Sequence, residues 1–228
     1  QMESAGMTGL CVGLKPQNIE DITAIIALYR PGPMDSIPRF IACKQNPDKV
    51  KYKHPLLEPI LSVTYGCIVY QEQVIEIFRK LAGYTLGQAD MVRRAISKKK
   101  KAQIERERKS FIYGDAERGI SGCIANGISE QTAEDIYDEI YDFANYAFNK
   151  AHAVSYAIVA YQTAWFKCHR TREYMAALLT SVLDYSEKVA EYIAECKECG
   201  ISLLPPDINE SGADFTVSGD CIRFGLVG

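Results

Sequence analysis

Hydrophobic positions recur every three or four residues along most of this chain, the pattern of helices that bury one face. Asn18 is a typical N-cap residue and is followed by acidic side chains, so a helix is predicted from there to Tyr29, ending at Pro31-Gly32-Pro33. The next helix has its apolar face at Val74, Ile75, Phe78 and Leu81. Gly83 is expected to end it, and another helix is predicted over residues 88–96.

Five further stretches also predict helices. The charged stretch that follows, up to Arg118, is typical of a long and largely exposed helix. Ser129 is predicted to cap an acidic helix whose apolar stripe is Ile136, Ile140, Phe143 and Ala144. Residues 152–166 are apolar nearly all round, which predicts a central buried helix. Helices are also expected over residues 172–183 and 187–199.

Extended structure is predicted only in short pieces. Residues 34–65 are rich in proline and are expected to be irregular, with a short helix near residues 37–43. Residues 67–70 form a short β-like run. Residues 214–217 and 221–226 predict a β-hairpin. The fold class is therefore mainly α, a multi-helix domain with a small β element at the C-terminal end.

Composition places the chain among soluble globular proteins, with 228 residues, 47% of them hydrophobic and 24% charged. The sequence lacks the pattern of a signal peptide, and the apolar run from residue 151 to 166 is too short to span a bilayer, so we expect a cytoplasmic protein without membrane contact. Eight cysteines are scattered, and only Cys196 and Cys199 form a CxxC. His169 is the nearest additional ligand, so reduced thiols are favoured and no metal site is predicted.

Charge is distributed unevenly around a net value of −3. Between Arg93 and Lys109 there are nine Lys or Arg residues and two Glu, whereas Glu130 to Asp142 contains six acidic residues and no basic ones. This distribution predicts one basic face and one acidic helix. A charge run of this kind is also typical of ordinary solvated surface.

Adjacent arginines, Arg93 and Arg94, lie in the run GYTLGQAD-x-x-RRA. Guanidinium groups stay charged and bind phosphate oxygens bidentately, which favours a phosphate-binding role. The alternative interpretation is an ion pair between Arg94 and Asp90 along the helix, with Arg93 in solvent.

A second candidate cluster is Tyr146, Lys150 and His152, directly before the apolar helix. Cations beside a helix N-terminus favour anions, and aromatic side chains offer a stacking surface for a base. The alternative is that His152 caps the helix or is a satisfied core residue.

Several longer runs give the chain a specific resemblance. They are ESAGM at residue 3, ALYRPGPM at 27, TYGCIVYQEQV at 64, the arginine run above, FNK-x-H at 148, AYQTA at 160, MAALLT at 175 and LPPDIN at 204. In this order they resemble the C-family bacterial replicative DNA polymerases, in the branch of the DNA polymerase III alpha subunits. The resemblance implies the helical fingers region of such a polymerase.

The resemblance also implies roles for individual residues. Arg93 and Arg94 match the arginines that contact the triphosphate of the incoming nucleotide, and Tyr146, Lys150 and His152 match the loop that faces the nucleotide site. The chain departs from the family pattern at Asn145, Ala147 and Ala151, where glycine, glycine and serine are usual.

The family's metal-binding motif, of the type Pro-Asp-x-Asp-x-Asp, does not occur in this sequence. Nucleotidyl transfer needs two divalent ions held by carboxylates. We therefore expect no catalytic residue here, Mg²⁺ ligands outside this chain, and an isolated chain without polymerase activity. Lys98, Lys99, Lys100 and Lys101 are candidates for contacts to the DNA backbone. The implied partners are primer-template DNA and deoxynucleoside triphosphate, with the sliding clamp and other replisome subunits bound through parts outside this chain.

The predicted organisation has three parts: residues 1–16 as the tail of the palm, residues 17–200 as the helical fingers, and residues 201–228 as the start of a following β-containing segment. Two other functions remain open. One is a helical scaffold that binds a protein partner and no nucleotide. The other is a free-standing phosphate-handling enzyme, which the missing metal-ligand motif disfavours.

Overall fold

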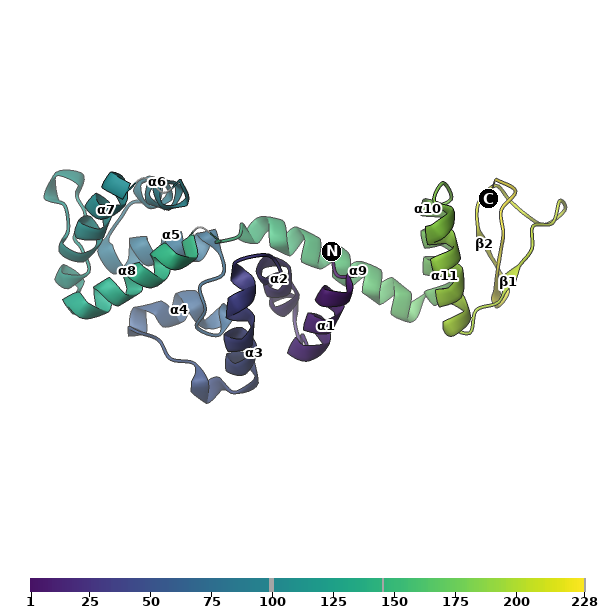
Figure 1. Ribbon diagram of the computed structural model, residues 1–228, viewed down its shortest axis with the longest axis horizontal. Helices are drawn as coiled ribbons and strands as arrows, with labels where there is room; N and C mark the ends of the chain where they lie inside the picture. The colour runs from purple at the N-terminus through teal and green to yellow at the C-terminus, as the bar shows by residue number, and fades with distance from the viewer. Residues whose placement is uncertain (99–100, 145, 228) are drawn as a thin grey trace. The chain divides into compact units, whose positions relative to one another are not determined.

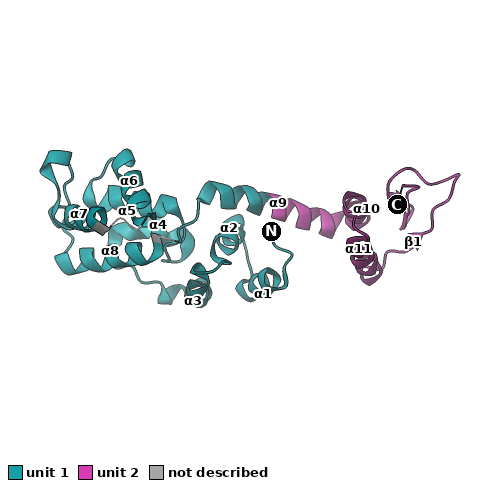
Figure 2. Ribbon diagram, turned by 45° about the horizontal axis from the view of Figure 1, so that its top comes forward, with its two compact units in different colours: residues 1–158 teal, residues 159–228 magenta. Residues whose placement is uncertain are grey.

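The computed structural model describes residues 1–98, 101–144 and 146–227 of the chain (Figure 1). It divides into two compact units, Gln1–Ile158 and Val159–Gly228, and the division falls within one helix, α9 (Figure 2). Over the described residues there are eleven α-helices and one sheet of three short strands, so the predicted mainly α class is confirmed.

The first unit holds the first eight helices and the beginning of the ninth. Their bounds are α1 Ala5–Leu14, α2 Ile19–Leu28, α3 Ile37–Gln45, α4 Glu58–Leu61, α5 Gln71–Ala82, α6 Leu86–Ser97, α7 Lys101–Tyr113, α8 Glu130–Ala144 and α9 Lys150–His169. The second unit contains the end of α9 and the remaining elements. These are α10 Thr171–Ser181, α11 Ser186–Glu198, β1 Leu203–Leu204, β2 Thr216–Ser218 and β3 Cys221–Arg223.

Local signals determine where the helices of the first unit begin and end. The Asn18 side chain accepts a hydrogen bond from the backbone N–H of Asp21 at 2.9 Å, as an N-cap should. Gly83 ends α5 with a φ of 77°, a left-handed conformation that glycine adopts without strain. Ser129 accepts from the N–H of Thr132 at 3.2 Å at the start of α8. All three helix boundaries were predicted from the sequence.

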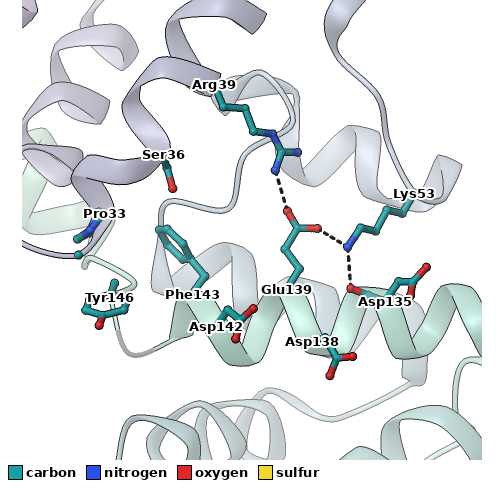
Figure 3. Close-up of a pocket in the computed structure, with 11 residues that line it drawn as sticks. Pro33, Ser36, Arg39, Lys53, Asp135, Asp138, Glu139, Asp142, Phe143 and Tyr146 are labelled. Atoms are coloured by element: carbon teal, nitrogen blue, oxygen red, sulfur yellow. Dashed lines mark hydrogen bonds and ion pairs between the residues drawn. The ribbon is translucent and has the colours of Figure 1, made fainter.

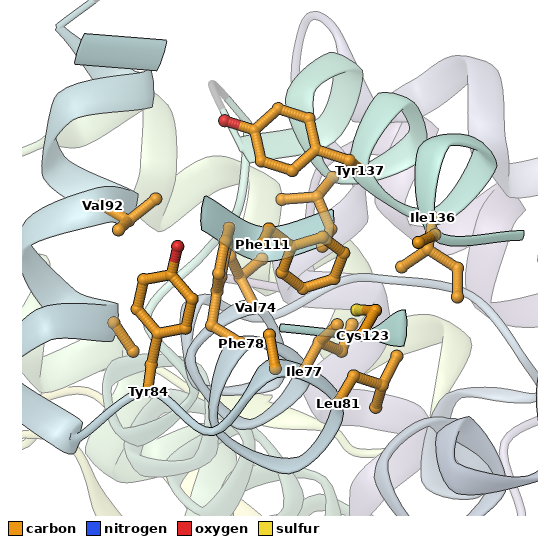
Figure 4. Close-up of a cluster of buried hydrophobic side chains, with 14 of the residues drawn as sticks. Val74, Ile77, Phe78, Leu81, Tyr84, Val92, Phe111, Cys123, Ile136 and Tyr137 are labelled. Atoms are coloured by element: carbon orange, nitrogen blue, oxygen red, sulfur yellow. The ribbon is translucent and has the colours of Figure 1, made fainter. Parts of the chain in front are cut away.

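Helices α5 to α8 enclose the larger hydrophobic core of the first unit (Figure 4). Phe78 of α5 lies at its centre, with its ring edge-on to Tyr84 at 5.2 Å and to Phe111 at 5.0 Å between centroids. Tyr137 of α8 contacts the same ring at 6.1 Å. Because each of these aromatic residues comes from a different segment, their packing fixes α6, α7 and α8 around α5.

A second core joins α1, α2, α3 and the start of α9. Next to it a charged pair is buried: Lys44 Nζ lies 3.3 Å from Asp21 Oδ2, and the two side chains are 7% and 1% exposed. The Asp21 carboxylate also accepts hydrogen bonds from the Tyr65 hydroxyl and from the Gln17 N–H, both at 2.8 Å. This network joins α2, α3 and the segment before α5, because its members come from all three.

The second unit packs α10 and α11 beside the small sheet. The strand order is β1-β3-β2, with β1 parallel and β2 antiparallel to β3. The predicted hairpin is confirmed in β2 and β3, where Val217 pairs with Ile222. The hydrophobic core of the second unit includes Met175, Leu179 and Cys196, all buried.

Three predictions about individual segments were wrong. The charged stretch forms a shorter helix than expected, since α7 ends at Tyr113, and Ile104 and Phe111 are buried in the core. Residues 152–166 are helical but mostly exposed: the small residues Ala153 and Ala157 are buried, while Tyr156 is 39% exposed and Trp165 is 43% exposed. Residues 67–70 make a single bridge, between Tyr70 and Phe148, instead of a strand. Among the described helices, none has the length and apolar character to cross a membrane.

Candidate functional site

The arginine pair lies on α6, whose start is fixed by a capping box. Thr85 Oγ1 accepts from the Gln88 N–H at 3.3 Å, and Gln88 Oε1 accepts from the Thr85 N–H at 2.8 Å. This cap starts the helix two residues earlier than predicted. Val92 and Ile96 are buried against α5, so Arg94 lies away from the core with 66% of its side chain exposed.

One carboxylate holds both arginines. Asp90 Oδ1 accepts hydrogen bonds from Arg93 Nε at 3.1 Å and Nη2 at 2.9 Å, and Asp90 Oδ2 lies 2.8 Å from Arg94 Nε. The hydrogen bond from Arg93 is the main cause that lowers the pKa of Asp90. The expected Arg94–Asp90 pair is therefore present. Arg93 is not in solvent as that alternative supposed, because its side chain is 15% exposed and bonds to the same carboxylate.

The N-terminus of α9 is already occupied by protein groups. Glu72 accepts the Lys150 N–H at 3.1 and 3.0 Å, and the Asn149 side chain accepts the His152 N–H at 2.8 Å. The Asn149 amide also donates to Glu72 at 3.1 Å. A carboxylate at this position takes the place that an anion would need. Binding of an anion here therefore depends on side chains and not on the helix end.

The Lys150 side chain contacts a second carboxylate and a buried tyrosine. Its Nζ lies 3.1 and 3.0 Å from the two oxygens of Glu20, and 5.4 Å from the centre of the Tyr70 ring. Tyr70 is fully buried, and within the described residues its hydroxyl has no hydrogen-bond partner. Burial, followed by the nearby Glu20 and Glu72 carboxylates, raises the pKa of this hydroxyl.

Tyr146 and His152 are exposed, and they are joined through Phe148. The His152 ring lies 5.6 Å from the Phe148 ring and 4.8 Å from Tyr156 between centroids. The Arg30 guanidinium lies over the Phe148 ring, with Cζ 4.6 Å from the ring centre. It also donates a hydrogen bond to the Tyr146 carbonyl. Arg30 and Phe148 thus link the Tyr146 backbone to the His152 ring within residues 146–152, here called the Tyr146 segment.

Arg30 is a residue of this site that sequence reasoning missed. It belongs to the RPGPM run, one of the runs that carry the resemblance to the polymerase family. Its burial lowers the pKa of its guanidinium. The neighbouring Gly32 has a φ of 100°, and a Cβ there would lie 2.4 Å from the Tyr146 ring. The RPGPM run therefore positions Tyr146, although the two are more than a hundred residues apart in the sequence. The glycine between two prolines was the sequence signal for this close approach.

The Gln73 side chain connects α5 to the backbone of the residues just before the helix. Its Oε1 accepts the N–H groups of Val69 at 2.8 Å and Tyr70 at 2.9 Å. Its Nε2 donates to the Ile60 carbonyl at 3.2 Å and to Thr64 Oγ1 at 2.7 Å. All polar positions of this buried amide are thereby used.

An acidic pocket lies beside Tyr146 (Figure 3). A pocket of about 670 Å³ is lined by Tyr146, by the RPGPM run and by the acidic face of α8. Arg39 and Lys53 both pair with Glu139 there, at 3.3 and 2.8 Å, while further carboxylates remain in its wall. A pocket with excess negative charge repels a triphosphate. The charge of this pocket therefore does not favour the binding of a free triphosphate.

A smaller pocket of about 480 Å³ opens beside Lys150. Its walls are mainly apolar and include Leu56, Ile60, Val63 and Tyr70. The lining also contains two lysines, Lys80 and Lys150, and two glutamates, Glu72 and Glu76, so its formal charges balance. The pocket thus lacks the excess of positive charge that a polyphosphate requires.

The predicted DNA-backbone lysines are only partly described. Lys98 is exposed at the end of α6, Lys99 and Lys100 lie outside the described residues, and Lys101 begins α7. Asn145 also lies outside the described residues. Farther along, the basic stretch is partly neutralised, because Arg108 pairs with Asp138 of the acidic helix α8.

Side chains that could hold a metal do not gather in the described residues. No group of three or more His, Cys, Asp or Glu side chains is arranged there as a ligand set. Residues Cys196 and Cys199 are free thiols, the first buried and the second exposed.

Comparison with known proteins identifies the family. The model of the bacterial DNA polymerase III alpha subunit finger domain matches residues 1–119. The chain therefore belongs to this family, and the resemblance read from its motifs is confirmed.

Relatives extend the similarity to nearly the whole chain. The chain is 46% identical over 226 residues to DNA polymerase III subunit alpha of Bacillus subtilis, 46% over 231 residues to that of Thermus aquaticus and 48% over 226 residues to that of Chlamydia muridarum. Each alignment covers 99% of this chain and 18 to 20% of the relative. The chain spans about a fifth of the length of these relatives.

Proposed function

We propose that this chain is the part of a DNA-directed DNA polymerase that binds the triphosphate of the incoming deoxynucleotide. The observation that carries the proposal is the pair Arg93 and Arg94 on α6, both of which contact the Asp90 carboxylate. Each guanidinium stays charged and can bind phosphate oxygens bidentately, so two of them at neighbouring positions suit a polyphosphate. Neutralising this charge and fixing the leaving group is how such a domain would contribute to nucleotidyl transfer.

Tyr146, Lys150 and His152 are proposed to face the same nucleotide from the start of α9. Lys150 would supply a further positive charge, Tyr146 a stacking surface, and His152 a hydrogen bond. Glu20 and Glu72 would keep this segment in place before the nucleotide binds, since both already contact Lys150.

The chemical step is assigned to residues outside this chain. Mg²⁺ would be held by carboxylates of another segment, and an isolated chain would not extend a primer. The full protein would act on primer-template DNA in the bacterial cytoplasm, and would contact the sliding clamp and other replisome subunits through its other parts. Residues 1–16, 17–200 and 201–228 remain our proposed division into palm tail, fingers and following β-containing segment.

Arginine modification in the full-length protein tests the proposal. Phenylglyoxal should modify Arg94, which is 66% exposed, and added deoxynucleoside triphosphate with Mg²⁺ and primer-template should protect it. Arg79 of α5 is the control, because it is an exposed arginine paired with one carboxylate and should react equally in both states. Equal modification of Arg94 with and without nucleotide would instead favour a helical scaffold that binds a protein partner.

Lys98 to Lys101 are proposed to contact the DNA backbone without sequence specificity. If the 228-residue chain makes about three to five phosphate contacts, a plot of log K for its binding to duplex DNA against log salt concentration should have a slope of about −3 to −5. Replacing the four lysines by alanine should flatten this slope in a fluorescence anisotropy titration. An unchanged slope would show that the run is ordinary solvated surface.

A further inference from the structure

Asp90 is a negative charge in the middle of the proposed triphosphate site. Its carboxylate accepts three hydrogen bonds or ion-pair contacts from the two arginines, at 3.1, 2.9 and 2.8 Å. By charge alone such a group should oppose the binding of a polyanion. Its side chain is 29% exposed, and its contacts given above are all to the two arginines that follow it on the same helix.

The contacts of Asp90 restrict two long side chains. Arginine loses much rotational freedom when it is immobilised by a ligand, at a cost in affinity of about 2- to 10-fold for each side chain. Asp90 holds Arg94 through Nε, and a guanidinium has five N–H donors, so this contact leaves donors of Arg94 for a ligand. Both arginines branch from adjacent positions on α6, and one carboxylate spans them.

We propose that Asp90 is a positioning residue, which holds the Arg93 and Arg94 guanidiniums in a shared arrangement before the nucleotide arrives. This inference rests on the proposed function of the two arginines. It predicts an effect whose sign is opposite to that of simple charge. Loss of the carboxylate weakens nucleotide binding through loss of order, although it removes a repulsive charge.

Nucleotide affinity and maximal rate should be measured by single-turnover primer extension with the full-length protein. Asp90→Ala should weaken the affinity for deoxynucleotide by about 3- to 30-fold, the combined cost of ordering two arginines less the repulsion that is removed. The maximal rate at saturating nucleotide should change less than about 2-fold, because the bound triphosphate then orders the arginines itself. Asp90→Glu should recover part of the affinity, since it restores the charge and the pairing.

The matched control is Asp48→Asn, which removes an exposed carboxylate from another part of the same unit and should leave the affinity unchanged. Tighter or unchanged nucleotide binding in Asp90→Ala would overturn the inference, as would failure of Asp90→Glu to recover affinity. Thermal melting separates these results from unfolding, and Asp90→Asn, which keeps the size of the side chain, provides a second variant with the same expected direction. If Arg94→Ala also leaves nucleotide affinity unchanged, the proposed function itself fails; if Arg94→Ala weakens it while Asp90→Ala does not, only the role of Asp90 fails.

Discussion

Arg93→Ala and Arg94→Ala should each lower kcat/KM for nucleotide incorporation by the full-length polymerase by about 10- to 100-fold. Each substitution removes a charge-assisted contact to a triphosphate, worth about 1.5–3 kcal/mol. Lysine at either position should restore only part of the rate, because an ammonium group lacks the two-pronged geometry of a guanidinium. Steady-state incorporation at varied nucleotide concentration is the measurement.

The control for this pair is Arg79→Ala, which removes an exposed arginine from the neighbouring helix α5. The affinity for primer-template alone should hardly change in any of these variants. If DNA affinity without nucleotide falls as far as kcat/KM does, the arginines hold the duplex and the nucleotide assignment is wrong.

Lys44→Met should destabilise the chain by about 3–5 kcal/mol, because it leaves the buried Asp21 carboxylate without its cation. Asp21 would retain the hydrogen bonds from Tyr65 and Gln17, which do not supply a compensating charge. Urea denaturation of the 228-residue chain, followed by circular dichroism, measures the shift in midpoint.

Two further variants test the cause of that loss. The double variant Lys44→Met with Asp21→Asn should recover part of the stability, since no uncompensated charge then remains. Lys51→Met, at an exposed lysine of the same region, should change stability by less than about 0.5 kcal/mol. A Lys44→Met variant as stable as the parent chain would mean that the pair contributes nothing net.

Elements controlled by neighbouring residues could be predicted from the sequence. Asn18, Ser129 and Gly83 act on backbone groups within a few positions of themselves, so the helix boundaries follow from the local order of residue types. The hairpin of β2 and β3 was found for the same reason, since its strands are adjacent along the chain.

Burial could not be predicted in the same way. A run of apolar residues tells how much surface a helix would bury and not which segment covers it, so α9 was expected inside although Tyr156 and Trp165 are exposed. For α7 the error was opposite. Charged residues dominate its sequence, yet Ile104 and Phe111 are enough to bury one face against α5 and α8.

Partners in the candidate site were predictable only where they are close in sequence. Asp90 lies three and four positions before the arginines, a spacing at which helical side chains meet, and its pairing with Arg94 was anticipated. The contact of Lys150 with Glu20 joins residues 130 positions apart, and that of Arg30 with the Tyr146 carbonyl joins residues 116 apart. No local pattern encodes such contacts.

The amide of Gln73 determines which backbone near the site can open independently. Its side chain, on the helix that carries Phe78, accepts the N–H groups of Val69 and Tyr70, so those two amides are protected from exchange as long as these hydrogen bonds last. Phe148 bonds to the same stretch of backbone through the Val69 carbonyl and the Gln71 N–H. Residues 69–71 are therefore expected to open together with α5, so their amides should exchange with solvent about as slowly as those of that helix.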